Sequence, residues 1–176
     1  AVWCSYKYLC GGPGAVAGAF VHERHASDAT LPRFAGWWGH DKDTRFAMGP
    51  EFVPIRGAEG WQLSNGPILA MAPLVASLEL FDAAGMERLR RKSLSLTAYA
   101  RRLLDARCGD RLRIVTPADE FRGCQLSLQL AAGPAAARRT FARLEAAGVI
   151  GDWREPDVIR LAPAPLYNTH AEVERC

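Results

Sequence analysis

The chain has 176 residues, a net charge of +3 and 49% hydrophobic residues. This composition is typical of a globular protein that can bury one good core or two small ones. The small positive charge does not favour nucleic acid or an anionic membrane as a partner. No apolar run reaches the roughly 20 residues that a membrane span needs, because the run from Ile68 to Leu80 is short and ends in acidic residues. We therefore expect a soluble protein with neither kind of partner.

The first 65 residues are rich in glycine, proline and aromatic residues, which predicts strands and loops around a site. Near their start, Lys7 lies between Tyr6 and Tyr8 and precedes the glycine-rich run Gly11–Gly14. Aromatic neighbours can lower the pKa of an amine by desolvation and so make it a nucleophile for carbonyl chemistry. Lys7 is therefore a candidate Schiff-base lysine. A surface lysine that packs its stem against tyrosines has the same local pattern.

From residue 67 the pattern becomes helical. Pro67 suits a first helical position, hydrophobic residues follow at mostly helical spacing, and Gly85 is expected to end the helix. A second helix is predicted over residues 86–106, with an inward side made of Leu89, Leu94 or Leu96, Tyr99 and Leu103. Its other side is strongly basic, and we interpret it as a solvated face made of Arg88, Arg90, Arg91, Lys92, Arg101 and Arg102.

Beyond Gly109 the order is strand, strand, helix, strand. Alternating residues predict strands over 112–116 and 124–130, a helix over 135–147 that is capped by Gly148, and a short strand over 158–161. Asn168 and Thr169 are expected to cap a closing helix. This order predicts a compact α+β domain.

A winged-helix nucleic-acid module is an alternative for residues 138–160. In that reading the helix would be followed by a wing made of residues 152–154 and 158–160. The wing would contain Asp152, Glu155 and Asp157, whereas phosphate binding favours a basic surface. The charge pattern therefore speaks against this alternative.

The five cysteines and four histidines follow no recognised ligand spacing. There is no Cys-x-x-Cys pair, which argues against a zinc site and against a disulfide framework. His22 and His25 are three residues apart without a third ligand nearby. We predict no metal site, and the reducing cytoplasm is the expected compartment.

Several segments together resemble the kynureninase family of pyridoxal-phosphate enzymes, in the family order. The first is the lysine segment, and the others follow it almost to the C-terminus. They are Gly18-Ala19-Phe20-Val21-His22-Glu23-Arg24-His25, Gly36-Trp37-Trp38-Gly39-His40-Asp41, Thr44-Arg45-Phe46, Gly60-Trp61-Gln62-Leu63-Ser64-Asn65, Arg122-Gly123-Cys124-Gln125-Leu126-Ser127 and the run from Asp157 to Asn168.

This resemblance implies an α/β chain with an aminotransferase-like fold. Residues 1–66 would be the end of the large cofactor-binding domain, residues 67–107 connecting helices, and residues 108–176 a small α+β C-terminal domain. The chain begins at Ala1 without a methionine or a signal-peptide pattern, so we expect a segment of a longer homodimeric enzyme. The large N-terminal portion of the family is absent, and the segment is expected to be inactive alone.

The resemblance also implies roles around the cofactor, pyridoxal 5'-phosphate. Lys7 would hold the cofactor and later move the substrate α-proton, and Tyr6 would lie near the phosphate as a proton relay. Trp37 and Asn65 match positions whose N–H groups bind the phosphate. In the family these donors can come from the partner subunit.

The implied substrate is L-kynurenine or 3-hydroxykynurenine, which is hydrolysed to anthranilate or its 3-hydroxy form and L-alanine. Arg160 matches the arginine that grips the substrate α-carboxylate, and an arginine in a short apolar strand needs such a partner. Trp38 would line the aromatic substrate pocket, and Asn65 would also face the aryl amine.

The match departs from the family at two positions. Cys10 stands where the family usually has asparagine, and Gly66 stands where proline is expected after Ser64-Asn65. Cys10 could alter the turn beneath the cofactor, and Gly66 could loosen the phosphate loop by giving its backbone more freedom. Cysteine desulfurases and aminotransferases share the general fold and remain alternatives, although the blocks at Trp37-Trp38, Ser64-Asn65 and Arg160 speak against them.

Overall fold

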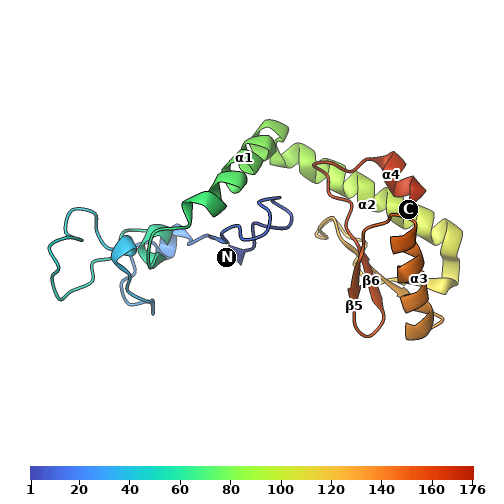
Figure 1. Cartoon of the computed structure of the whole chain (residues 1–176), viewed down its shortest axis with the longest axis horizontal. Coiled ribbons are helices and arrows are strands. Elements are labelled where there is room, and N and C mark those ends of the chain that lie inside the picture. Colours follow the sequence, from blue (N-terminus) through green and yellow to red (C-terminus); the bar gives the residue numbers. More distant parts are fainter. The chain divides into compact units, whose positions relative to one another are not determined.

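The computed structural model describes residues 1–176, and Figure 1 shows its helices and strands. The chain forms two compact units, Ala1–Leu80 and Phe81–Cys176. The first unit contains little regular structure before its helix. Strands β1 (Val2–Trp3) and β2 (Gly18–Ala19) form an antiparallel pair. Three 3₁₀ turns follow, at Glu23–His25, Trp37–Gly39 and Ala58–Trp61.

Helix α1 (Ile68–Ala84) begins in the first unit and confirms the helix expected after Pro67. The carbonyl of Pro67 accepts hydrogen bonds from the amides of Ala70 and Met71, each at 3.1 Å. Gly85 ends the helix at a φ of 78°, where a residue without Cβ is unstrained. No single helix of the chain is long and apolar enough to cross a membrane. Helices α1 and α2 (Met86–Cys108) meet the length and composition requirement only as a bent pair.

The second unit is an antiparallel sheet with helices. Its helices are α2 (Met86–Cys108), α3 (Pro134–Ala146) and α4 (His170–Arg175). Its strands are β3 (Leu112–Ile114), β4 (Leu126–Leu130), β5 (Asp152–Arg154) and β6 (Val158–Leu161), in the spatial order β3-β4-β6-β5. The predicted α+β domain is therefore present, and the two strands of the alternative wing belong to this sheet.

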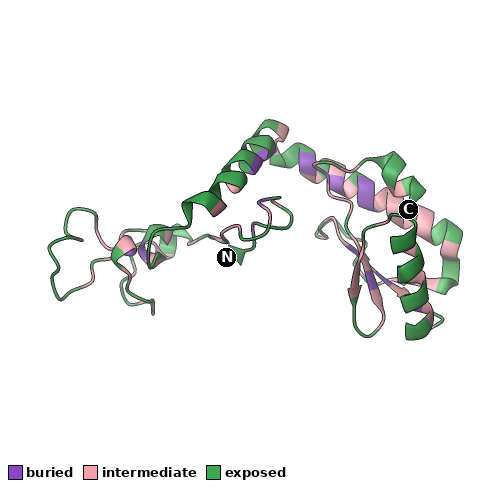
Figure 2. Ribbon diagram, viewed as in Figure 1, coloured by how far each residue is buried: buried purple, intermediate pink, exposed green.

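The core of the second unit lies on one face of the sheet. Leu126, Leu128 and Ile159 are buried there, as the alternation of β4 and β6 predicts. Partly buried residues of α2 and α3 pack against this cluster, so both helices cover the same face, and Figure 2 shows the buried positions along α2 and the strands. On α2, Leu96 is fully buried and Leu94 only half-buried, which settles the alternative that the sequence left open.

Two expectations for this unit were wrong. The α+β interpretation lacked strand β5, which has only three residues and was named only as part of the alternative wing, and β3 and β4 are shorter than predicted. The basic side of α2 is not wholly solvated. Arg90 donates to the carbonyl of Arg122 at 2.6 Å, and Arg101 donates to the carbonyl of Thr116 at 2.8 Å. Both arginines are half-buried because they attach the loop after β3 to the helix.

Candidate functional site

Lys7 lies on a tight turn that the backbone fixes. The amide of Cys10 donates to the carbonyl of Lys7, and the amide of Gly11 donates to the carbonyl of Ser5, each at 2.9 Å. Ser5 is buried. A Cβ on Gly11 would lie 2.9 Å from the Ser5 carbonyl oxygen, so only glycine allows this close approach. The turn therefore holds the backbone of Lys7 in one place.

The amine of Lys7 has a polar and aromatic environment at the surface. Its Nζ lies 4.3 Å from the centre of the Tyr6 ring and 3.7 Å from Sγ of Cys4. The hydrogen bond with Tyr6 raises the pKa of Lys7 above its ordinary value, and this effect exceeds the opposing desolvation. The expectation that aromatic neighbours lower the pKa of Lys7 was therefore wrong for this chain, because the side chain is not buried enough for desolvation to dominate.

Cys10 adopts a left-handed conformation in the same turn, with a φ of 55°. Asparagine is among the few residues other than glycine that tolerate this region, whereas cysteine has a less favourable energy there. The departure noted at Cys10 thus has a structural meaning. Cys10 therefore holds this turn in a left-handed backbone conformation that asparagine would adopt with less strain.

Trp37 and Trp38 form a second part of the site. Their rings meet edge to face at a centroid distance of 5.0 Å. The Arg45 guanidinium lies over both rings and donates to the carbonyls of Trp38 and His40 at 3.0 and 3.1 Å. The Trp37 side chain is 48% exposed, so its indole N–H can reach a ligand. Sequence reasoning missed the role of Arg45, although its segment was among the family blocks.

Asn65 belongs to the same neighbourhood as the tryptophans through its loop. A Cβ on Gly36 would lie 2.2 Å from Cα of Leu63, and one on Gly39 would lie 2.7 Å from the Gln62 carbonyl oxygen. The two glycines therefore let the tryptophan turn pack directly on the segment that leads to Asn65. The side chain of Asn65 is exposed, and its Oδ1 accepts from the Ser64 hydroxyl at 3.1 Å.

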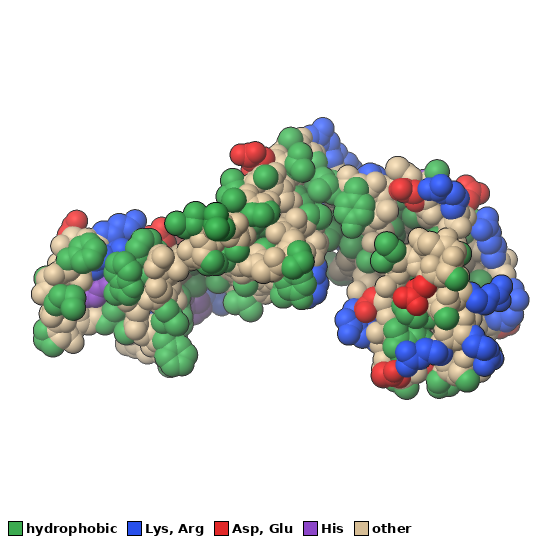
Figure 3. All heavy atoms as spheres, in the orientation of Figure 1, with side chains coloured by type: hydrophobic (Ala, Val, Ile, Leu, Met, Phe, Trp, Pro, Cys, Tyr) green, Lys and Arg blue, Asp and Glu red, His purple; other side chains and the backbone are tan.

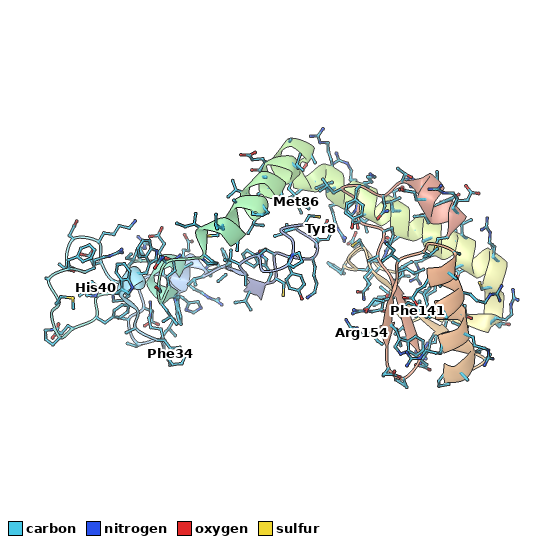
Figure 4. The ribbon with its side chains drawn as sticks, in the orientation of Figure 1. Tyr8, Phe34, His40, Met86, Phe141 and Arg154 are labelled. Atoms are coloured by element: carbon cyan, nitrogen blue, oxygen red, sulfur yellow. The ribbon has the colours of Figure 1, made fainter.

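The Lys7 turn and the tryptophan turn lie apart within the first unit. Figure 4 shows Tyr8, which lies in the first turn, well separated from His40, which follows the second. No hydrogen bond, ion pair or ring contact connects Lys7 or Tyr6 with Trp37, Trp38 or Asn65 in this chain. The structure thus brings together Lys7 with Tyr6, and the tryptophans with the Asn65 loop, but not one group with the other.

Arg160 lies in the second unit, in the middle of β6. Its Nε donates to Oδ2 of Asp152 at 2.5 Å, and its Nη2 contacts the same oxygen. Asp152 is directly opposite on β5 and also pairs with Arg154, at 3.1 Å. The expected need of Arg160 for a partner is therefore met in part by Asp152, which sequence reasoning did not identify because only the wing alternative placed a strand at residues 152–154.

Comparison with known proteins shows the family of this chain. Residues 89–176 match the family described as the kynureninase C-terminal domain. The kynureninases of Stenotrophomonas maltophilia strain K279a and Xanthomonas oryzae pv. oryzae strain PXO99A are each 63% identical over 174 residues, which is 98% of this chain and 41% of theirs. The kynureninase of Xanthomonas campestris pv. campestris strain B100 is 61% identical over 176 residues. The chain thus spans about two fifths of the length of these curated relatives.

Solved structures agree with the expected fold. A mutant of C-DES with glycine covalently linked to its PLP cofactor has a TM-score of 0.62 at 19% identity, covering 88% of this chain and 38% of that one. The complex of the cystine C-S lyase C-DES with its product cysteine persulfide has a TM-score of 0.58, also at 19% identity, covering 81% and 36%. The fold is that of the C-terminal part of aminotransferase-like enzymes, and the chain belongs to the kynureninase family.

Proposed function

We propose that this chain provides the cofactor lysine, phosphate donors and carboxylate-binding arginine of a pyridoxal-phosphate-dependent kynureninase. Such an enzyme hydrolyses L-kynurenine or 3-hydroxykynurenine to anthranilate or 3-hydroxyanthranilate and L-alanine. The observation that carries the proposal is the accessible Lys7 amine on its fixed turn, next to Tyr6, within a chain 63% identical to curated kynureninases.

The residues present fit the cofactor. Lys7 offers a primary amine at the surface, and Trp37 and Asn65 offer exposed neutral N–H donors of the kind that phosphate oxygens accept. When bound, pyridoxal phosphate supplies an electron sink for bond cleavage next to the substrate amine. Lys7 would hold the cofactor and move the α-proton, and the Tyr6 hydroxyl would relay protons near the phosphate.

The remaining residues would position the substrate. Arg160 would bind the α-carboxylate, and Trp38 and Asn65 would face the aromatic ring and its amine. The separation of Trp37 and Asn65 from Lys7 supports a homodimer in which these donors act on the cofactor of the other subunit. We place the enzyme in the cytoplasm, where its five unpaired cysteines would stay reduced.

Borohydride trapping of pyridoxal phosphate on the purified chain tests the lysine. The chain has three lysines, so Lys42, which pairs with Glu59 at 3.6 Å, and Lys92 are internal controls. Peptide mapping should find the label mainly on Lys7, and Lys7→Arg should remove it. The raised pKa keeps the Lys7 amine protonated to a higher pH than an ordinary lysine, so selective labelling has to come from the site around Lys7, and labelling should increase as the pH rises and frees the amine. Equal labelling of all three lysines would contradict a prepared site in this chain.

A segment exchange tests the reaction. This chain would replace the matching segment of the Stenotrophomonas maltophilia kynureninase, and release of anthranilate from L-kynurenine would be measured. We expect activity from the exchanged enzyme and none from its Lys7→Ala variant. A folded, cofactor-loaded enzyme that does not cleave kynurenine would overturn the proposed function.

A further inference from the structure

The face of the second unit's sheet that is opposite to α2 and α3 carries a polar row across three strands. Arg160 on β6 is aligned with Asp152 on β5 and with Ser127 on β4. Directly opposed residues point to the same face of a sheet. Since Ile159 is buried on the core side, Arg160 projects to the other side.

Asp152 occupies one particular edge of the Arg160 guanidinium. Its Oδ2 accepts from both Nε and Nη2 of Arg160, which form the side edge of the planar group. Nη1 of Arg160 has no hydrogen-bond partner within the chain. The end edge, formed by Nη1 and the second hydrogen of Nη2, therefore stays available. This edge has the fork geometry that binds a carboxylate through two parallel hydrogen bonds.

The charges in this cluster do not balance. Nε of Arg154 lies 3.1 Å from the same Oδ2, so two guanidinium groups share one carboxylate. The cluster carries one excess positive charge, which one further carboxylate would neutralise. The Arg160 side chain is only 28% exposed, and partial burial strengthens its attraction for that carboxylate because solvent screens the charge less.

We propose that Asp152 is a positioning residue for substrate binding, which holds the Arg160 guanidinium so that its end edge faces the substrate α-carboxylate. Arg154 keeps the cluster cationic while Asp152 is engaged. The proposal rests on the proposed function, in which Arg160 binds that carboxylate. Asp152 itself acts only through Arg160. The opposite arrangement, in which Asp152 competes with the substrate for Arg160, makes the opposite prediction for substrate affinity.

Steady-state kinetics of the exchanged kynureninase distinguish the two arrangements. Asp152→Asn should raise KM for L-kynurenine about ten-fold with kcat changed less than about two-fold, because a carboxylate contact present in both ground and transition states affects binding alone. Asp152→Glu, which keeps the charge, should have an intermediate KM. Asp157→Asn is the matched control. Asp157 lies in the same hairpin, accepts from Gln129 at 3.0 Å and has no contact with Arg160, so its KM should not change.

An unchanged or lower KM for Asp152→Asn would overturn the proposal, and a lower KM would indicate competition. NMR of the arginine Nε–H groups in the 176-residue chain supplies a readout that does not require turnover. The Arg160 Nε–H should exchange slowly with solvent in the wild type and fast in Asp152→Asn, while the amide signals of β5 and β6 persist. Fast exchange already in the wild type would overturn the positioning role. Loss of kynurenine cleavage by the wild-type exchanged enzyme, with the Arg160 signal protected, would instead reject the proposed function.

Discussion

The two units of the chain differ in where their hydrophobic side chains lie. All of the buried hydrophobic residues that form the core belong to the second unit, whereas the buried residues of the first are small, such as Ser5 and Gly39. Seventeen of the 22 exposed large hydrophobic side chains lie in the first unit. Figure 3 shows the contrast on one face: hydrophobic side chains over the first unit, and lysine and arginine side chains over the second.

This difference shows which part of the chain can fold around its own core. The second unit packs two helices against one face of a sheet, which is a complete layered arrangement. In the first unit, α1 consists almost entirely of apolar residues from Ile68 to Leu78, and Leu69 is 89% exposed. A helix that is hydrophobic all round is usually buried. The first unit therefore needs additional apolar surface to be stable, and the site loops on it depend on that surface.

Separating the units should have the largest effect. Residues 81–176 alone are expected to unfold cooperatively on heating, because they retain every buried hydrophobic residue of the chain. Residues 1–80 alone are expected to show no cooperative transition and to bind a dye specific for exposed apolar surface. Circular dichroism and dye fluorescence would measure both. A sharp thermal transition in residues 1–80 would show that the first unit is self-sufficient.

Two leucine substitutions sharpen the same comparison. Leu126→Ala should lower the free energy of unfolding of the second unit by about 2–5 kcal/mol, because it leaves a cavity among Leu128, Ile159 and the helices. Leu69→Ala, at an 89% exposed position, should change it by less than about 0.5 kcal/mol. Urea unfolding of the 176-residue chain measures both values. Equal changes in the free energy of unfolding would contradict the expectation that buried leucines stabilise the chain more than exposed ones.

The sequence predicts the second unit better than the first for a physical reason. Alternation along β4 and β6 and the helical spacing of α2 are local patterns, so Leu96 and Leu126 are recognisable as core residues. Strand β5 is too short to show a pattern and exists only because it pairs with β6. The attachment of Arg90 and Arg101 to loop carbonyls is likewise a tertiary contact. No periodicity in α2 separates these arginines from the solvated ones.

The sequence nominates residues for the candidate site but does not give their contacts. Lys7, Trp37, Asn65 and Arg160 come from motif resemblance, and their roles stay predictions. The raised pKa of Lys7 and the pairing of Arg160 with Asp152 depend on three-dimensional contacts. Each reverses or completes an expectation that was based on neighbours in sequence. For Lys7 the neighbours along the chain do set the pKa, but its direction depends on the hydrogen bond with Tyr6 and on the exposure of the side chain, which the order of residues does not give.

The strained turn after Lys7 gives a smaller, local prediction for the first unit. Cys10→Asn should stabilise the turn by about 1 kcal/mol, because asparagine tolerates a φ of 55° better than cysteine does. The amides of residue 10 and Gly11 are hydrogen-bonded in the turn. Their hydrogen exchange should therefore be about five-fold slower in Cys10→Asn than in the wild type. Cys10→Ser is the matched control, since it replaces the thiol and keeps the strain. Equal slowing in both variants would attribute the effect to loss of the thiol.

The smallest expected effect concerns the closing helix of the second unit. Thr169 and Glu172 form a capping box at the start of α4, in which the Glu172 carboxylate accepts from the Thr169 amide at 2.7 Å. These hydrogen bonds from the backbone and side chain of Thr169 lower the pKa of Glu172 below its ordinary value of 4.5. A lowered folded-state pKa stabilises the helix at pH values above the unfolded-state pKa, and this stabilisation is lost as the pH falls through the folded-state pKa.

Glu172→Gln should therefore lower the melting temperature of residues 81–176 slightly at pH 7, and the difference from the wild type should shrink below pH 4.5. Glu145→Gln, at an exposed position on α3, is the control and should show no such convergence. A difference that stays constant from neutral to acidic pH would mean that the carboxylate charge does not contribute to the cap.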